Sequence, residues 1–192
     1  MKKIYNILLT SLLITCLFSC DKFLDVEPVS NGVAVNNTSS DSVLYSTASE
    51  VEAALAGVYS DFRNEYFELD YFVNGDAQSD DAYAGADNPA NFKIDDFNID
   101  ATNLNITREW AYLYSTIGKA NAVIDNVNAV PDSALTTERR KGIMAEASFI
   151  RAFMYFQLVQ LCSDVPLVLN SVTTFDLDIL PLLFPPRTPA NE

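Results

Sequence analysis

One run of residues after Thr136 carries an apolar stripe that is too wide for a single neighbouring element to cover. Its apolar residues recur every three or four positions, which is the period of an α-helix. A stripe this broad needs burial on more than one side of the helix. The sequence therefore predicts a long helix with more than one packing partner. The stripe consists of Ile143, Ala147, Ile150, Met154, Leu158 and Leu161, widened by Phe149, Phe153 and Phe156.

A second helical pattern precedes it and ends near Pro131. Since only about residues 129–133 separate the two patterns, we expect an antiparallel helical hairpin. Trp110 and Leu113 match the opening of a tetratricopeptide unit, a short match for which packing is the simpler explanation. One hairpin cannot bury both of its faces, so neighbours are required. The apolar face contains Trp110, Leu113, Tyr114, Ile117, Asn121, Ile124 and Val127.

A third helix is predicted over residues 47–63. Thr47 and Glu50 have the spacing of a capping box, in which each side chain binds a free backbone N–H of the first turn. One apolar face follows at helical spacing and can pack on the hairpin. With no comparable strand pattern, the three helices predict an all-α body with long irregular loops. The face contains Val51, Ala54, Leu55, Val58, Tyr59 and Phe62.

The first twenty residues have the order of a bacterial lipoprotein signal peptide. Two lysines precede an apolar run that ends before Asp21, shorter than the roughly 20 residues of a membrane span. A transmembrane helix or an ordinary signal peptide are the alternatives. We predict a signal peptide over 1–19 and lipid on Cys20, because Ser19 suits cleavage better than the Thr15 that precedes Cys16. Two or three acyl chains, at about 0.8 kcal/mol per methylene, give firm membrane anchoring.

The mature chain would be strongly acidic. All 26 acidic residues follow Cys20 and two of the 12 basic residues precede it, so the net charge becomes 10 − 26, or −16. Nucleic acid is therefore not expected as a partner, because phosphate binding depends on clustered Lys and Arg. The chain has no histidine, which excludes histidine-dependent hydrolases. With Cys20 acylated, Cys162 has no free thiol to pair with, and the fold must depend on its apolar core.

Residues 66–106 mix aromatic side chains with Asp, Asn and Gln. Aromatic faces and amide or carboxylate groups suit hydroxyl-rich ligands such as sugars, and long irregular segments are often functional. The alternative is that the aromatic residues fasten this loop to the helices while the acids face water. The candidate ligand-binding residues are Tyr71, Asp76, Asp81, Tyr83, Asn88 and Phe92.

Other chemistry in this segment is less well supported. Asp76, Asp80, Asp81 and Asn88 could supply oxygen ligands to calcium, but their spacing does not fit an EF-hand. Paired carboxylates could serve glycoside hydrolysis, yet so many acids make some pairing inevitable. We therefore predict no metal site, no catalytic residue and no cofactor.

Four stretches of the chain resemble, in order, landmarks of SusD/RagB-type outer-membrane lipoproteins. They begin with the run around the lipid cysteine and end in the predicted long helix, and Asp164-Val165-Pro166-Leu167-Val168 extends the match. Most of the matching residues pack, so they indicate the fold rather than a ligand. The four stretches are Cys20–Asp25 with Pro28, Glu50–Ser60, Trp110–Asp125 and Glu146–Phe156.

The resemblance implies a mostly helical, surface-exposed protein of the outer membrane with tetratricopeptide-like hairpins. Members of the family bind oligosaccharides or other nutrients, do not catalyse, and deliver their ligand to a SusC-like TonB-dependent transporter. On this basis we expect a lipidated tether over 20–46 and a helical SusD-like N-terminal domain over 47–170. A Pro-rich tail would follow over 171–192.

The resemblance also implies a longer chain than this one. Family members continue into another helix after a Pro-Arg-Thr-Pro stretch, whereas here Pro186–Pro189 is followed only by three residues. We therefore expect a truncated N-terminal portion, in which part of the family's pocket is absent. A structural or adhesin-like surface lipoprotein and a carbohydrate-active hydrolase remain as alternative functions.

Overall fold

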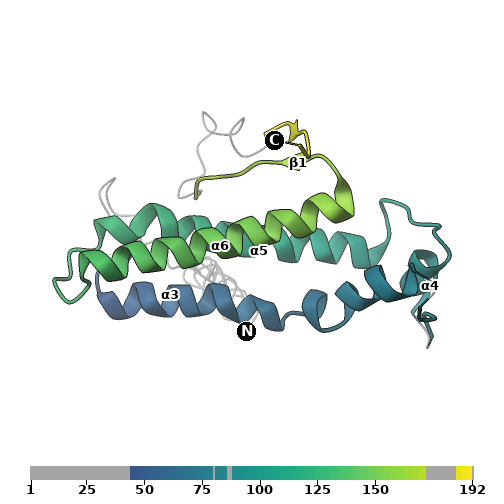
Figure 1. Ribbon diagram of the computed structural model, residues 1–192, viewed down its shortest axis with the longest axis horizontal. Coiled ribbons are helices and arrows are strands. Elements are labelled where there is room, and N and C mark those ends of the chain that lie inside the picture. The colour runs from purple at the N-terminus through teal and green to yellow at the C-terminus, as the bar shows by residue number, and fades with distance from the viewer. Residues whose placement is uncertain (1–43, 80, 86–87, 172–184, 192) are drawn as a thin grey trace, which may run out of the picture. The chain divides into compact units, whose positions relative to one another are not determined.

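Two long helices, α5 (Leu104–Asn126) and α6 (Thr137–Cys162), lie side by side and run antiparallel in the computed structural model (Figure 1). The structure describes residues 44–79, 81–85, 88–171 and 185–191, all within one compact unit, Ser39–Glu192. The hairpin and its two helix periods are confirmed. The predicted signal peptide, Cys20 and most of the tether lie outside the described residues.

A third helix, α3 (Ala48–Ser60), packs against both members of the hairpin and continues into a 3-10 turn, η2 (Asp61–Arg63). The capping box is confirmed: the Glu50 backbone N–H donates to Thr47 Oγ1 at 3.2 Å, and the Thr47 N–H donates to Glu50 Oε2 at 3.3 Å. Each of the three helices contributes fully buried side chains to one apolar core. They include Val51, Val58, Leu113, Ile117, Ile143, Ile150, Met154 and Leu158.

The outermost part of the predicted stripe on α6 is not buried. Phe153 packs on Phe62 and Phe67, with ring centroids 5.8 and 6.1 Å apart, as expected. Phe149 and Phe156, in contrast, are 67% and 55% exposed. These two residues face away from α3 and α5, so the apolar stripe is wider than the described neighbours can cover. None of the described helices is both long and apolar enough to cross a membrane.

The segment between α3 and α5 contains more helix than its sequence indicated. Two π-helical turns, η3 (Tyr66–Asp70) and η4 (Val73–Ala77), follow the core helix, and α4 (Pro89–Asp95) comes later. The buried residues of η3 are Tyr66 and Asp70, which lie four positions apart and face α5. One of these two buried residues is therefore polar. This pattern is hard to recognise in a sequence, because a helical face is normally identified by apolar residues alone.

An extended stretch after α6 lies along the hairpin. Its strand β1 (Val165–Pro166) pairs antiparallel with β2 (Arg187–Thr188), so part of the predicted tail is ordered next to the helices. Asn121 Nδ2 donates to Val168 O at 2.9 Å, and the Val168 N–H donates to Tyr155 Oη at 2.7 Å. The predicted apolar cluster at 179–184 lies outside the described residues.

One arginine holds the connection between α5 and α6. Arg140 donates from all three guanidinium nitrogens to four backbone carbonyls, which belong to Val127, Val130, Asp132 and Leu135, over 2.6–3.2 Å. These carbonyls lie at and beyond the C-terminal end of α5, where the helix has no partners of its own for them. Arg140 therefore caps one helix from the first turns of the next.

Replacing Arg140 should destabilise the hairpin. We expect Arg140→Ala to lower the free energy of unfolding by about 2–3 kcal/mol, since partly buried carbonyls lose charged donors. Lys141→Ala, at the exposed neighbouring position, is the matched control and should change it by less than about 0.5 kcal/mol. Urea denaturation followed by circular dichroism measures both. Equal effects in the two variants would contradict this role of Arg140.

Candidate functional site

Two of the six candidate ligand-binding residues form an aromatic pair at the surface. The rings of Tyr83 and Phe92 lie 6.3 Å apart at an angle of 47°, and Tyr83 is 79% exposed. Phe92 is positioned by α4, which packs against η4. Its rigid helix and the partial burial of its ring fix one side of the pair. An exposed apolar face next to polar groups is suited to stacking on a flat, hydroxyl-bearing ligand.

Asn88 has a structural task in the same region. Its side-chain oxygen accepts a hydrogen bond from the Ala90 N–H at 3.0 Å and thereby caps α4, with Pro89 at the first helical position. Its amide nitrogen donates to Asn91 Oδ1 at 3.2 Å. Both polar ends of Asn88 are thus bound within the chain, which positions α4 and the Phe92 it carries.

Tyr71 belongs to a different aromatic group. Its ring packs edge to face on the buried Tyr66 and on the exposed Phe72, with centroids 6.3 and 5.8 Å apart. Tyr71 and Phe72 are 47% and 54% exposed. The structure therefore divides the candidate residues into two aromatic groups. The sequence analysis did not single out Phe72, although it follows Tyr71 directly.

The two acidic candidates are exposed and lie in a short turn. The backbone carbonyl of Asp76 accepts hydrogen bonds from the N–H groups of Asp81 and Ala82 at 3.2 and 3.1 Å, and Asp81 Oδ2 accepts one from Ser79 Oγ at 3.4 Å. Within the described part of the chain, no group of three or more acidic or cysteine residues could hold a metal ion. Asp80 lies outside it.

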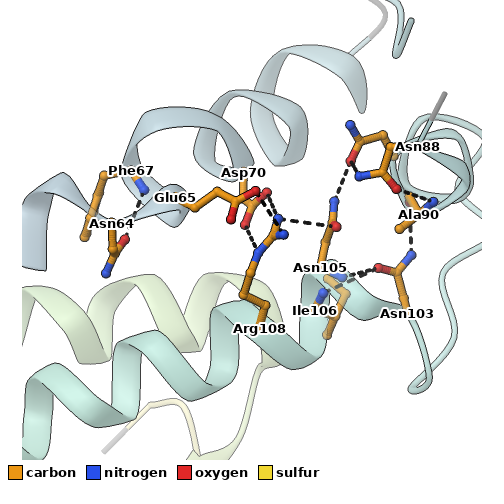
Figure 2. A network of polar contacts seen from close by, with 11 residues as sticks. Asn64, Glu65, Phe67, Asp70, Asn88, Ala90, Asn103, Asn105, Ile106 and Arg108 are labelled. Carbon is orange, nitrogen blue, oxygen red and sulfur yellow. Dashed lines mark hydrogen bonds and ion pairs between the residues drawn. The ribbon is translucent and has the colours of Figure 1, made fainter. Parts of the chain in front are cut away.

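A buried ion pair joins this segment to α5. Asp70 is fully buried and accepts two hydrogen bonds from the Arg108 guanidinium, at 2.6 Å from Nη2 and 3.2 Å from Nε (Figure 2). Arg108 Nη1 also lies 3.0 Å from Glu65 Oε1. Burial raises the pKa of Asp70, and the charge of Arg108 opposes that shift. The pair is therefore a structural clamp between η3 and α5, in which the charged form of Asp70 depends on Arg108.

Asparagine side chains extend this clamp towards α4. Asn105 Oδ1 accepts from Arg108 Nη2 at 3.4 Å, and its amide donates to Asn91. Asn103 caps α5 with its side-chain oxygen and donates to the Ala90 carbonyl at 3.0 Å. In Figure 2 these side chains form one continuous network between η3, α4 and the start of α5. The network connects η3, which precedes Tyr71, to α4, which carries Phe92.

Glu109 is an acid buried in this region without such support. It is 1% exposed, and neither of its carboxyl oxygens has a hydrogen-bond partner among the described residues. Burial raises the pKa of Glu109 to about 7. Asn74 lies close enough to oppose this shift, but the two side chains fall short of hydrogen-bond geometry. Sequence analysis did not single out Glu109, because it occupies an ordinary position beside Trp110.

A separate pocket of about 370 Å³ opens between α6 and the stretch that contains β1. Its walls are largely apolar, with Val159, Leu167 and Leu169 among them, and Arg151 is its charged side chain. Arg151 Nη1 is held by Asn121 Oδ1 at 2.8 Å and by the Leu169 carbonyl at 3.0 Å. This side chain is thus occupied in fixing the wall of the pocket.

Comparison with known proteins connects this architecture to one family. Residues 22–179 match the family model of SusD-like proteins described as "Starch-binding associating with outer membrane". The chain is 28% identical to SusD-like protein P25 of Formosa agariphila over 93% of its own length and 34% of that protein. It is 26% identical to a SusD-like protein of Bacteroides ovatus over 84% of its length and 28% of that protein.

A solved structure agrees with the sequence matches. The crystal structure of a SusD-like carbohydrate-binding protein from Bacteroides fragilis superimposes with a TM-score of 0.59 at 26% identity. The superposition covers 76% of this chain and 28% of that one. The chain thus spans about a third of the length of the curated relatives it matches.

Breaking the buried ion pair should destabilise the fold in a pH-dependent way. We expect Arg108→Met to cost about 3 kcal/mol at pH 7, because Asp70 remains buried as an unpaired charge. The loss should be smaller at pH 4 than at pH 7, because burial raises the pKa of Asp70 and a protonated Asp70 leaves no charge buried. Arg63→Met removes an exposed arginine and is the control. Urea denaturation at both pH values measures the difference, and a loss that grows at low pH would contradict the assignment.

Proposed function

The chain belongs to the SusD-like family of starch-binding proteins that associate with the outer membrane, and from this premise we propose that it binds oligosaccharides at the bacterial surface. The observation that supports this function best is the Tyr83–Phe92 pair, in which the exposed Tyr83 ring lies 6.3 Å from the half-buried Phe92 ring. Such a pair offers an apolar face without requiring any rearrangement of the core. A ring of a sugar could stack there while neighbouring polar groups bind its hydroxyls.

The remaining candidate residues would have different tasks in this proposal. Asp76 and Asp81 are exposed and could accept hydrogen bonds from sugar hydroxyls. Asn88 would act by positioning Phe92 through the cap of α4. Tyr71, with its neighbour Phe72, would form a second and separate contact surface. We propose binding without catalysis, and no cofactor or metal takes part.

The same family membership suggests the location and partner. We propose that lipid on Cys20 anchors the protein in the outer membrane and that residues 20–46 tether it there. A SusC-like TonB-dependent transporter would then receive the bound nutrient. The proposal applies to the part of the family's length that this chain spans, about a third of the curated relatives.

Glycan binding can be tested at the aromatic pair. We expect Tyr83→Ala to weaken binding of maltoheptaose by roughly tenfold, since a single interface aromatic commonly contributes more than 1 kcal/mol. Phe149→Ala, another exposed aromatic, lies on α6 and is the matched control, so it should leave binding unchanged. Isothermal titration calorimetry of the full chain measures all three proteins.

The alternative functions predict other outcomes. A stable chain that binds neither maltoheptaose nor any member of an oligosaccharide panel would favour a structural or adhesin-like lipoprotein. Release of shorter sugars from the panel, abolished by Asp→Asn changes between residues 70 and 100, would indicate a hydrolase. If Tyr83→Ala and Phe149→Ala weakened glycan binding equally, the Tyr83–Phe92 pair would not be the glycan site.

The lipid anchor has its own test. We expect Cys20→Ala to move the protein from the membrane fraction to the soluble fraction, because the acyl chains provide the anchoring energy. Mass spectrometry of the N-terminal peptide should show two or three acyl chains on Cys20 in the unmodified sequence. Cys162→Ala is the control and should remain in the membrane fraction. Full membrane retention of the Cys20 variant would refute the anchor.

A further inference from the structure

Glu109 lies at the junction of three elements and is unpaired there. It projects from α5 into a region bordered by η3, η4 and the C-terminal end of α6, where its side chain is 1% exposed. Both of its carboxyl oxygens lack a hydrogen-bond partner among the described residues, and so does Nδ2 of Asn74 on η4. Buried polar atoms without partners are rare in folded proteins, and each calls for a physical explanation.

The groups around Glu109 give its charged form little support. They are Tyr66 and Asp70 on η3, Asn74 on η4, Arg108 on α5 and Cys162 on α6. Arg108, the one cation among them, already binds Asp70 and Glu65 at 2.6 and 3.0 Å. The charge of Asp70 disfavours a second negative charge nearby. A neutral carboxyl group is therefore far easier to accommodate here than a carboxylate.

Glu109 can ionise only if water reaches its carboxyl group. The η3–η4 segment, which covers that group, opens more easily than the opposite side of α5. Residues 66–77 cover Glu109 with two π-helical turns, a rare form of helix that is frequent at functional sites. The opposite side of α5 packs into the apolar core with α3 and α6. The π-helical segment contributes only Tyr66 and Phe67 to that core and is otherwise held to α5 by the Asp70–Arg108 pair, so opening it exposes far fewer apolar side chains than opening the opposite side.

We propose that Glu109 is a proton-controlled latch: the η3–η4 segment stays packed on α5 while this carboxyl group is protonated and opens when it ionises. Because Tyr71 and Phe72 lie on the segment, opening would also disperse their aromatic surface. The latch would thus control the second proposed contact surface but not the Tyr83–Phe92 pair, since neither Tyr83 nor Phe92 lies on the segment.

The direction of the pH effect follows from the raised pKa. Glu109 binds its proton more tightly in the closed segment, with a pKa of about 7, than in an open segment, where the ordinary value is 4.5. The closed form is therefore favoured at low pH. Its advantage declines by up to about tenfold per pH unit between about 5 and 7 and then levels off.

Hydrogen–deuterium exchange of the full chain from pH 5 to 8 tests the latch. After correction for intrinsic exchange rates, we expect protection of residues 66–77 to fall about tenfold per unit between pH 5 and 7, while the centre of α6 stays unchanged. Glu109→Gln, which cannot ionise, should abolish the dependence. Glu68→Gln removes an exposed acid from the same segment and should preserve it.

Two results would overturn the proposal. One is a protection of residues 66–77 that does not change with pH, and the other is the same pH dependence in the Glu109→Gln variant. If that variant does not fold, carbon-13 NMR of the Glu109 carboxyl group in the unmodified chain decides. A titration midpoint near 7 supports the latch, whereas a midpoint below 5 refutes it.

Discussion

A row of buried polar side chains on α5 holds the rest of the chain against the helical core. Its buried positions include Asn105, Glu109, Thr116 and Asn121, spread over most of the helix. Thr116 Oγ1 donates to Asp61 Oδ2 of η2 at 2.9 Å, and Asn121 binds the carbonyls of the stretch after β1. Thr116 and Asn121 thus each fix a segment that has little apolar surface of its own, whereas Glu109 has no such partner among the described residues. The cost of burying a polar group is offset where a specific partner meets it.

The sequence predicted the helices that apolar residues define. Thr47 and Thr136 marked two helix starts correctly, and the centre of the stripe is buried as expected, at Ile143, Ala147, Ile150, Met154 and Leu158. The start of α5 at Leu104 was missed, because its first turns bury Asn105 and Glu109 instead of apolar residues. The same reason explains η3, where Asp70 is buried. The periodicity of apolar residues identifies helix faces that pack on apolar surfaces, and it does not identify faces that pack through hydrogen bonds.

The candidate site was predictable in its residue types but not in its arrangement. The sequence shows aromatic and amide residues in the segment before α5, and the structure brings two of the candidates, Tyr83 and Phe92, together. Their sequence does not reveal that Asn88 caps a helix, since Asn serves caps and ligands with the same oxygen. Nor does it reveal that Asp70 needs Arg108, 38 residues later, because a long-range ion pair has no local pattern. Side-chain type limits the possible chemistry, and only the fold decides which groups remain available.

Asp70 and Glu109 show how strongly one charged partner changes the effect of burial on a carboxyl group. Both acids lie within the same interface, and both are shielded from water to a similar extent. Arg108 forms a two-pronged contact with Asp70, so the clamp retains a charge whose attraction opposes desolvation. Glu109 has no equivalent donor, and desolvation dominates its protonation. The Arg108 guanidinium therefore gives the Asp70 carboxylate a fixed structural role. Glu109, which follows Arg108 on α5, has no such partner and remains sensitive to pH.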